Sequence, residues 1–427
     1  MTPRRRRRAG KLGLWDSTAM AVGGMIGGGI FSVLGVAITL AGHLAVGCFV
    51  LGAAVAAVTA RSFAGVTARA GRSGGPFDHL REEGHPQLAG LLLWLLVLGY
   101  MVAMAVYSFT FGRYAADAFG APPWTARVLT AAVIAAFLGV NLRGVRVSSL
   151  VEDLIVLVKV VILAGIAAVG IAHFSTTRLS PLANEGLGGL FLGAATVLFA
   201  YEGFELICYD RDDMHDPERT LPRALYTSVG IVAVIYIAVT FGAQMLVSDS
   251  VIVAHKEVAF ASVGRAALGE PGRWAAIVGA LFATGSAINA TLFSCSRLIR
   301  DASASGDLPA ALGRESRGLP IMAMTAISVA GASMAMLPGI TAVIAFGSAA
   351  FLAIYTIVNY LQMTMATRLR SRLVAAAGLV ACIAAIGALV VELARDDRRG
   401  LAVLVALVVA VAVGRSRYVV RRHAPAD

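Results

Sequence analysis

Charged side chains are scarce in this chain: only 14% of its 427 residues are Asp, Glu, Lys or Arg, whereas 58% are hydrophobic. A water-soluble domain of this length needs far more polar surface, so the composition excludes an ordinary soluble fold. Apolar runs of membrane-spanning length recur along the whole chain, and no polar domain interrupts them. We therefore expect one all-α integral membrane domain.

The motifs of several other function classes are missing. The chain has no G-x-x-x-x-G-K-[ST] loop, which excludes transport powered directly by a nucleotide. Its four cysteines all fall in apolar runs, at spacings that fit no metal site or disulfide framework. The seven histidines are scattered, and no paired acids suggest catalysis. We expect no enzyme activity, no cofactor, no metal and no nucleic-acid partner.

The apolar runs predict twelve membrane spans. Their approximate limits are 14–38, 43–61, 88–119, 125–142, 150–173, 187–209, 224–247, 273–300, 320–338, 341–366, 373–392 and 400–414. With the N-terminus inside, the inner segments hold 26 basic residues and the outer segments hold 8. The positive-inside rule then places both termini in the cytoplasm. We expect the chain to span the cytoplasmic (inner) membrane. Residues 1–13 would form a basic arm and residues 415–427 a tail, both on the cytoplasmic side.

The first span contains a cluster of glycines at its middle. Five of the seven residues from Gly23 to Gly29 are glycine, and each costs a helix about 1 kcal/mol relative to alanine. Unwound backbone is tolerated inside a membrane only where it lines a cavity or is buried in protein. Close packing against another helix is one explanation. A discontinuous helix is the explanation we favour, because its freed N–H groups can bind a carboxylate.

The sixth span carries a second candidate break, at Tyr201-Glu202-Gly203-Phe204-Glu205. Interrupted spans at corresponding positions of two halves are typical of transporters built from an inverted repeat, here of five plus five spans. The binding site is then expected near the middle of the membrane, between spans one and six.

Several stretches together resemble one transporter family in the same order. They are Gly23 to Phe31, Gly74 to Phe77, Phe199 to Glu205, Asp216 to Ala224 and Gly306 to Pro309. On these stretches the chain resembles the amino acid–polyamine–organocation (APC) permeases over roughly residues 12–370. The resemblance implies a LeuT-type fold, with a ten-helix transporter core at 14–370 and two additional transmembrane helices, 11 and 12, at 371–414.

The resemblance also implies a substrate site. By matching positions, the backbone of Gly28 and Gly29 would hold a substrate carboxylate, the carbonyls of Met25, Phe199 and Glu202 would hold its ammonium, and the Phe199 ring would cap the site. The full set of implied substrate-binding residues is Met25, Ile26, Gly27, Gly28, Gly29, Phe199, Ala200, Tyr201, Glu202 and Glu205. At the position of Glu202, relatives often carry an apolar residue instead.

Lys159 lies inside the fifth span, where a cation is expensive. The chain has three lysines against 33 arginines, yet this buried base is a lysine, which can release its proton when it is desolvated. A lysine that reaches the inner interface is the simpler explanation. The resemblance favours the other: the position matches a lysine that replaces the sodium ion of sodium-coupled relatives, with Gly23 and Ser286 as neighbours.

These observations predict a secondary active transporter of an amino acid, a basic amino acid or an amine, driven by protons. Exchange without proton coupling stays an alternative, and a channel or a receptor on the same scaffold is a weaker one. An ionised Glu202 would favour a substrate with a second cationic group, whereas a protonated Glu202 could carry a second proton. The substrate and the oligomeric state stay open.

Overall fold

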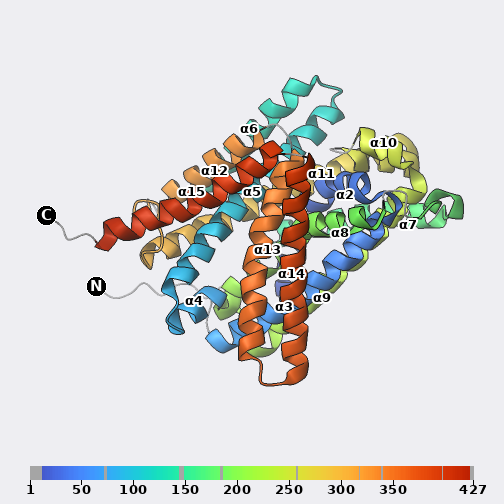
Figure 1. Cartoon of the computed structure of the whole chain (residues 1–427). Coiled ribbons are helices and arrows are strands. Elements are labelled where there is room, and N and C mark those ends of the chain that lie inside the picture. The colour runs from blue at the N-terminus through green and yellow to red at the C-terminus, as the bar shows by residue number, and fades with distance from the viewer. Residues whose placement is uncertain are drawn as a thin grey trace.

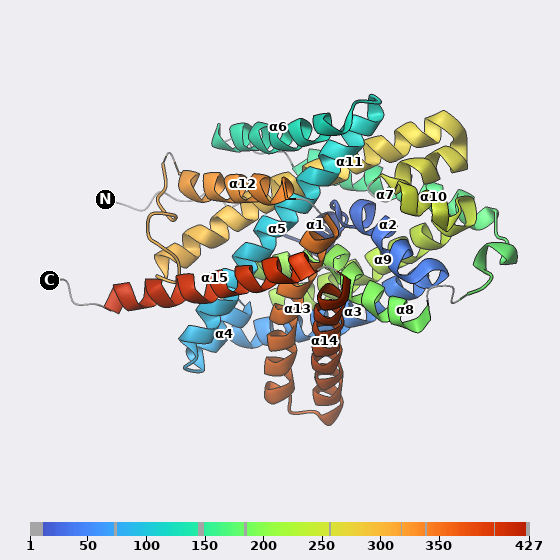
Figure 2. The ribbon, with the colours of Figure 1, turned by 45° about the horizontal axis from the view of Figure 1, so that its top comes forward.

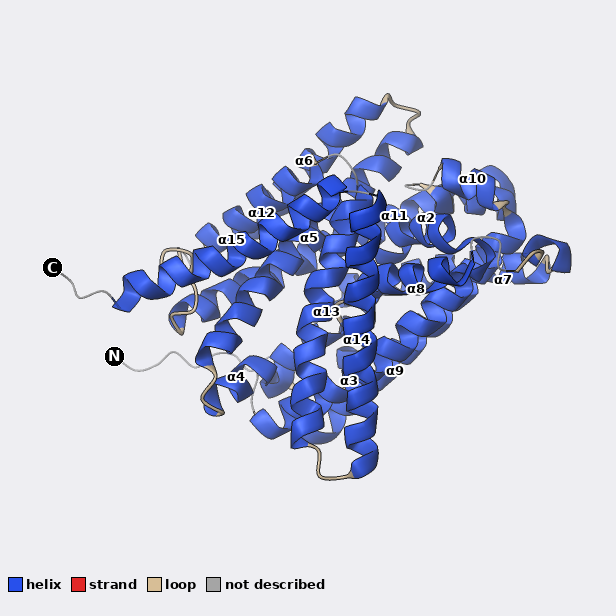
Figure 3. Ribbon diagram, viewed as in Figure 1, coloured by secondary structure: helices blue, strands red, loops and turns tan. Residues whose placement is uncertain are grey.

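The structure is a computed structural model, and it describes residues 12–71, 75–143, 149–182, 186–255, 258–316, 318–337, 340–396 and 398–423. Most of the basic arm expected at 1–13 and the last residues of the tail lie outside these ranges. In the described parts the chain is helical throughout, with short turns between the helices (Figure 3). This confirms the all-α membrane class, and the number of crossings is taken up below.

Each of the twelve expected spans coincides with helical structure. The elements in chain order are α1 (Leu14–Met25), α2 (Gly29–Ala41), η1 (Gly42–Leu44), α3 (Ala45–Ala70), α4 (Gly75–Glu82), α5 (Pro86–Ala118), α6 (Pro123–Leu142), α7 (Ser149–Ala172), η2 (Thr176–Leu179), α8 (Gly186–Val197), η3 (Leu198–Tyr201), η4 (Phe204–Asp213), α9 (Pro217–Leu246), α10 (Asp249–Ala254), α11 (Ala259–Ala304), α12 (Ile321–Ala335), α13 (Ile340–Met365), α14 (Leu369–Asp396) and α15 (Arg398–His423).

Within the described residues, nine helical stretches are long and apolar enough to cross a membrane. The first of them, 42 residues long, includes both α2 and α3. Two apolar helices, Ile321–Ala335 and Gly400–Ser416, are shorter. Many large apolar side chains stay exposed along α7, α14 and α15, as expected where the surrounding solvent is lipid.

The largest differences from the expected limits lie at helix ends. The second span was expected to end at residue 61, but α3 continues to Ala70 and closes on Gly71, whose φ of +71° suits a left-handed helix end. The eighth was expected from 273, but α11 starts at Ala259 and includes a kink at Leu268 and Gly269. The kink lies just before Pro271, which cannot continue regular helical hydrogen bonding.

The helices pack around α1, α2, α8, η3 and η4, which hold the two glycine-containing segments. Helix α9 packs on α1, α3 and α7, while α5 packs on α6, α11, α12 and α13. Helices α13 and α14 run side by side as a pair (Figures 1 and 2). Buried residues from α1, α2, α3, α5, α9, α11 and α13 form one continuous apolar core around these segments.

Candidate substrate site between two broken helices

The first expected break is present in the structure. Helix α1 ends at Met25 and α2 begins at Gly29, so Ile26, Gly27 and Gly28 form a non-helical link. Ile26 still donates its amide to the Val22 carbonyl at 2.8 Å, but its ψ of 58° takes the chain out of the helix. Among the described residues, the amides of Gly27 and Gly28 donate no hydrogen bond. Free amide groups therefore lie at the start of α2, where the helix dipole adds positive potential.

The second expected break is also present, and it is irregular over a longer stretch. Helix α8 gives way to the tighter turn η3, and Glu202 is extended with ψ at 156°. Gly203 follows with φ at +104°, a conformation that only glycine adopts without strain, and η4 begins after it. The segment thus turns sharply at the centre of the molecule.

The two breaks lie directly against each other. A Cβ atom on Gly203 would lie 2.9 Å from the carbonyl carbon of Gly24, and one on Gly29 would lie 2.8 Å from the Cα of Ala200. Real Cβ atoms do not approach backbone so closely, so both positions require glycine. Close packing, the alternative explanation of the glycine cluster, therefore acts together with the break: glycine both opens the helix and lets the two segments touch.

A tyrosine that the sequence analysis missed joins the two breaks. The Tyr236 hydroxyl on α9 lies 2.7 Å from the Met25 carbonyl oxygen and 3.1 Å from that of Ala200, and the tyrosine is fully buried. Met25 ends the first half-helix, and Ala200 belongs to η3 just before the second break. One hydroxyl thus lies within hydrogen-bonding distance of carbonyls from both broken helices.

Glu202 is held by a second missed tyrosine. The Tyr107 hydroxyl on α5 donates a hydrogen bond to Glu202 Oε1 at 2.6 Å. Glu202 is 3% exposed, and its other oxygen, Oε2, is buried with no hydrogen-bond partner among the described residues. The Tyr107 ring passes beside the first break, since a Cβ on Gly28 would lie 2.6 Å from Tyr107 Cδ1. Glu202 therefore lies close to both breaks and keeps one acceptor unused.

Glu205 has a different environment. The Gly203 amide donates to its Oε2 at 3.0 Å, the Tyr355 hydroxyl donates to the same oxygen at 3.3 Å, and the Tyr100 hydroxyl donates to Oε1 at 3.2 Å. This carboxylate therefore holds the turn at Gly203 in place and links α5 and α13 to it. It was expected to bind substrate, but its hydrogen bonds fit a structural role.

The other residues expected in the site divide into two groups. The Phe199 ring is buried against Gly347 of α13 and lies 6.2 Å, centroid to centroid, from the Tyr107 ring. The Phe199 carbonyl accepts the Glu202 amide at 3.3 Å. The Tyr201 hydroxyl instead donates to the Phe49 carbonyl of α3 at 2.9 Å, so this side chain is turned away from the meeting point of the breaks.

Lys159 lies where the sequence analysis expected it with respect to the first break. Its side chain is fully buried, and Nζ donates to the Gly23 carbonyl oxygen at 3.0 Å. Lys159 forms no ion pair within hydrogen-bonding distance in the described part of the chain. Ser286, the other expected neighbour, is half-buried on α11, and no hydrogen bond joins it to Lys159. An amine thus lies against the backbone of the broken helix.

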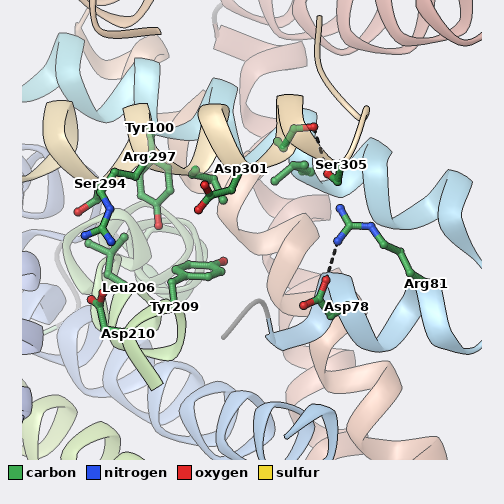
Figure 4. Close-up of a pocket in the computed structure, with 13 residues that line it drawn as sticks. Asp78, Arg81, Tyr100, Leu206, Tyr209, Asp210, Ser294, Arg297, Asp301 and Ser305 are labelled. Carbon is green, nitrogen blue, oxygen red and sulfur yellow. Dashed lines mark hydrogen bonds and ion pairs between the residues drawn. The ribbon is translucent and has the colours of Figure 1, made fainter. Parts of the chain in front are cut away.

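A cavity of about 290 Å³ opens on one side of the site, at the end of the molecule where α5 begins and where η4 and α11 end. We call this end the cavity face. Tyr100, Tyr209, Arg297 and Asp210 project into the cavity (Figure 4). Tyr100 in the wall of the cavity also hydrogen-bonds Glu205, so this side chain lies between the cavity and the second break.

Aromatic rings pack together near the other end of α5. The Phe31 ring lies edge-on to the rings of Tyr114 and Phe260, with centroids 6.0 and 5.3 Å apart. Farther out, Arg273 of α11 binds the Asp117 carboxylate at the end of α5 at 2.9 Å. The cavity therefore opens at the end where α5 begins, and packed aromatic rings lie at the other end.

Two broken helices that meet inside a helical membrane domain, with a cavity beside the second, are typical of a membrane transporter. Comparison with known proteins agrees: residues 12–413 match the amino acid permease family, and the chain belongs to that family.

Three relatives illustrate the family. An inner membrane transport protein of Escherichia coli is 30% identical over 307 residues, 70% of either chain. The human Asc-type amino acid transporter 1 is 29% identical over 318 residues, 71% of this chain and 60% of the relative. A methylthioribose transporter of Bacillus subtilis is 29% identical over 246 residues, 54% of this chain and 53% of the relative. The chain is therefore a multi-pass membrane transporter for a small molecule and not an enzyme.

Proposed function

We propose that this protein carries an amino acid across the cytoplasmic membrane by alternating access, with the substrate bound between the two breaks and a proton moving with it. The observation that carries the proposal is the direct contact of the two broken helices beside their breaks, Gly24 against Gly203 and Gly29 against Ala200. Unwound backbone inside a membrane is expensive, and transporters use it to build a binding site near the midplane.

The breaks offer the two poles that a zwitterionic amino acid needs. The free amides of Gly27 and Gly28 and the first turn of α2 suit a carboxylate. Carbonyl oxygens at the ends of the other half-helices, including those of Met25 and Phe199, suit an ammonium. The Met25 carbonyl already accepts the Tyr236 hydroxyl, which leaves its second lone pair for a substrate.

The packing of the helices supports an inverted repeat of five plus five spans. If α1 with α2, α3, α5, α6 and α7 form the first half, then α8 with η3 and η4, α9, α11, α12 and α13 form the second. Contacts of one half recur in the other: α1 with α9 corresponds to α8 with α3, and α7 with α9 to α13 with α3. Likewise α7 with α11 corresponds to α13 with α5. A pseudo-two-fold relation explains this reciprocity.

In this proposal each of the twelve expected spans crosses the membrane once, and the cavity face is cytoplasmic. The first crossing consists of two short half-helices, α1 and α2, and the ninth is the 15-residue α12. The excess of arginine in the segments at the cavity face supports this orientation through the positive-inside rule. The structure then represents a state that is open toward the cytoplasm.

Lys159 is proposed to couple transport to protons. A proton that binds the amine creates a buried ammonium, whose best acceptor is the carbonyl of Gly23 in the first half-helix. Release of the proton weakens that bond and frees α1 to move relative to α7. The charge on Lys159 thus biases the position of α1, and α1 bounds the substrate site.

Radiolabelled uptake into proteoliposomes tests the function. We expect accumulation of an amino acid when the pH gradient is directed inward in sodium-free buffer. The substrate set includes neutral, acidic and basic amino acids and diamines, and methylthioribose is added because one relative is named for it. Uptake that occurs only against a preloaded amino acid would indicate an exchanger instead. A strict sodium requirement would contradict proton coupling.

A further inference from the structure

One buried oxygen at the centre of the site has no partner. Glu202 Oε1 accepts the Tyr107 hydroxyl, whereas Oε2 is buried with no hydrogen-bond partner in the described residues. A buried polar atom without a partner costs about 1–3 kcal/mol, and more if it is charged. A bound ligand can supply the missing partner of such an atom.

Glu205, the second carboxylate on the same segment, is fully hydrogen-bonded by residues of the site. Glu205 lies three residues farther on and receives hydrogen bonds from Gly203, Tyr100 and Tyr355, so both of its oxygens are satisfied. The site therefore has the means to satisfy a buried carboxylate from its own residues, and Glu202 is satisfied on one side only.

Among the described residues, no basic side chain forms a hydrogen bond or an ion pair with Glu202. Neither it nor Glu205 forms a salt bridge with any residue that the structure describes. Lys159, the buried base on α7, donates to Gly23 instead. In a water-poor interior an uncompensated carboxylate attracts a cation strongly, because the effective dielectric constant is low.

In the proposed binding mode, the carboxylate and the ammonium of a neutral amino acid bind other groups than Glu202 Oε2. Its carboxylate suits the amides at the start of α2, and its single ammonium suits the carbonyl oxygens of the broken helices. Tyr107 holds Glu202 near the start of α2, since its ring lies beside Gly28 and its hydroxyl donates to Oε1. A substrate that satisfies all of these groups carries one positive group more than a neutral amino acid.

We propose that Glu202, oriented by Tyr107, binds a second cationic group of the substrate, so that the transporter selects basic amino acids or diamines over neutral amino acids. This inference rests on the proposed function, because it assumes that the space between the breaks is the substrate site. Glu202 supplies the charge, and Tyr107 positions it.

Binding to the purified, detergent-solubilised protein tests the proposal, with lysine and norleucine as the matched pair. The two differ in the terminal ammonium and have nearly the same length. We expect lysine to bind at least about tenfold more tightly than norleucine, as truncating one partner of a buried charge pair commonly costs more than that. Cadaverine, which lacks the carboxylate, separates the two substrate classes: binding equal to lysine identifies diamines, and weaker binding identifies amino acids.

Substitutions locate the preference. Glu202→Gln keeps the shape but removes the charge, and we expect it to bring the lysine-to-norleucine affinity ratio close to one. Tyr107→Phe removes the positioning hydroxyl, and we expect it to lower the affinity ratio less than Glu202→Gln does. Glu270→Gln is the control, since it removes one negative charge from an exposed ion pair with Arg265 on α11, outside the site and the cavity, and is expected to leave the ratio unchanged.

Two results would overturn the proposal. The first is a wild-type protein that binds norleucine as tightly as lysine, a measurement that needs no variant to fold. The second is a Glu202→Gln variant that melts like the wild type and keeps the lysine preference. Transport of neutral amino acids without lysine would refute this subsite alone, whereas absence of transport for every substrate tested would refute the proposed function.

Discussion

At the scale of single residues, Lys159 is the group proposed to carry the proton. Its amine is buried on α7, and its only hydrogen bond to a described residue is to the Gly23 carbonyl. Arginine is the common base in this chain, but a guanidinium cannot release its proton under physiological conditions. A carrier that must bind and release a proton in each cycle therefore needs lysine at this position.

We predict that Lys159→Gln abolishes accumulation driven by a pH gradient but keeps substrate binding. Glutamine can still donate to the Gly23 carbonyl, although it cannot change charge. The measurement is uptake by proteoliposomes with and without an inward proton gradient, with counterflow exchange as the control for an intact site. Lys159→Arg should behave in the same way. Gradient-driven uptake by either variant at wild-type rate would place proton coupling elsewhere.

Gly29 lies where the neighbouring backbone leaves no room for a side chain. A Cβ there would meet the Cα of Ala200 at 2.8 Å, and backbone cannot yield as a flexible side chain can. We predict that Gly29→Ala pushes the two breaks apart, lowers the melting temperature and weakens substrate affinity more than tenfold. Gly165→Ala on α7 is the matched control, because a Cβ there meets no other residue. That variant should be neutral or slightly stabilising, by about 1 kcal/mol at most. Equal behaviour of the two variants would contradict the contact between the breaks.

At the scale of helices, Tyr236 connects elements that are far apart in the sequence. Its hydroxyl on α9 contacts the end of α1 and the turn η3 together. A hydroxyl carries one hydrogen, so it donates fully to only one of the two carbonyls at a time. The pair of carbonyls is therefore left partly unsatisfied, and an ammonium with three donors can complete it.

We predict that Tyr236→Phe raises KM more than it changes the maximal rate. Loss of the hydroxyl leaves the Met25 and Ala200 carbonyls to repel each other, so the breaks separate and the ammonium pole is less well formed. Uptake kinetics across a range of substrate concentrations measure the two parameters. A Tyr201→Phe variant serves as the control, since that hydroxyl binds α3 instead. A Tyr236→Phe protein with unchanged KM would show that the bridge does not shape the site.

The same contacts show what the sequence could predict. Both breaks were predictable, because five clustered glycines and Gly203 disfavour helix locally. The helical segments were predictable from apolar runs. The tyrosines were not: Tyr107, Tyr100 and Tyr355 reach Glu202 and Glu205 from positions about a hundred residues away or more, and a single tyrosine in an apolar helix has no local signature. Pairing across such distances depends on the tertiary packing alone.

At the scale of the whole molecule, the two ends of the helical domain differ in how they are packed. Charged and polar residues line the cavity, whereas aromatic rings pack together at the other end. A transporter that alternates must reverse this arrangement, and the contacts of Phe31 with Phe260 and of Arg273 with Asp117 are the ones that must separate. The side that is open in this state is a property that can be measured in intact membranes.

We predict that Ser294→Cys reacts with a membrane-impermeant thiol reagent only from the cytoplasmic side. Ser294 is half-buried in the wall of the cavity, and the four native cysteines are all buried, so the background reaction is low. Ser250→Cys is the matched control on α10, at the opposite end of the molecule, where the serine is exposed. It should react only from outside.

Right-side-out and inside-out vesicles distinguish the two sides. If both cysteines react from the same side, the proposed topology is wrong; if their sides are exchanged, the orientation is reversed. Substrate should slow labelling at Ser294, because a substrate bound between the breaks favours closure of the cavity, and labelling that does not respond to any transported substrate would contradict a cavity on the transport path.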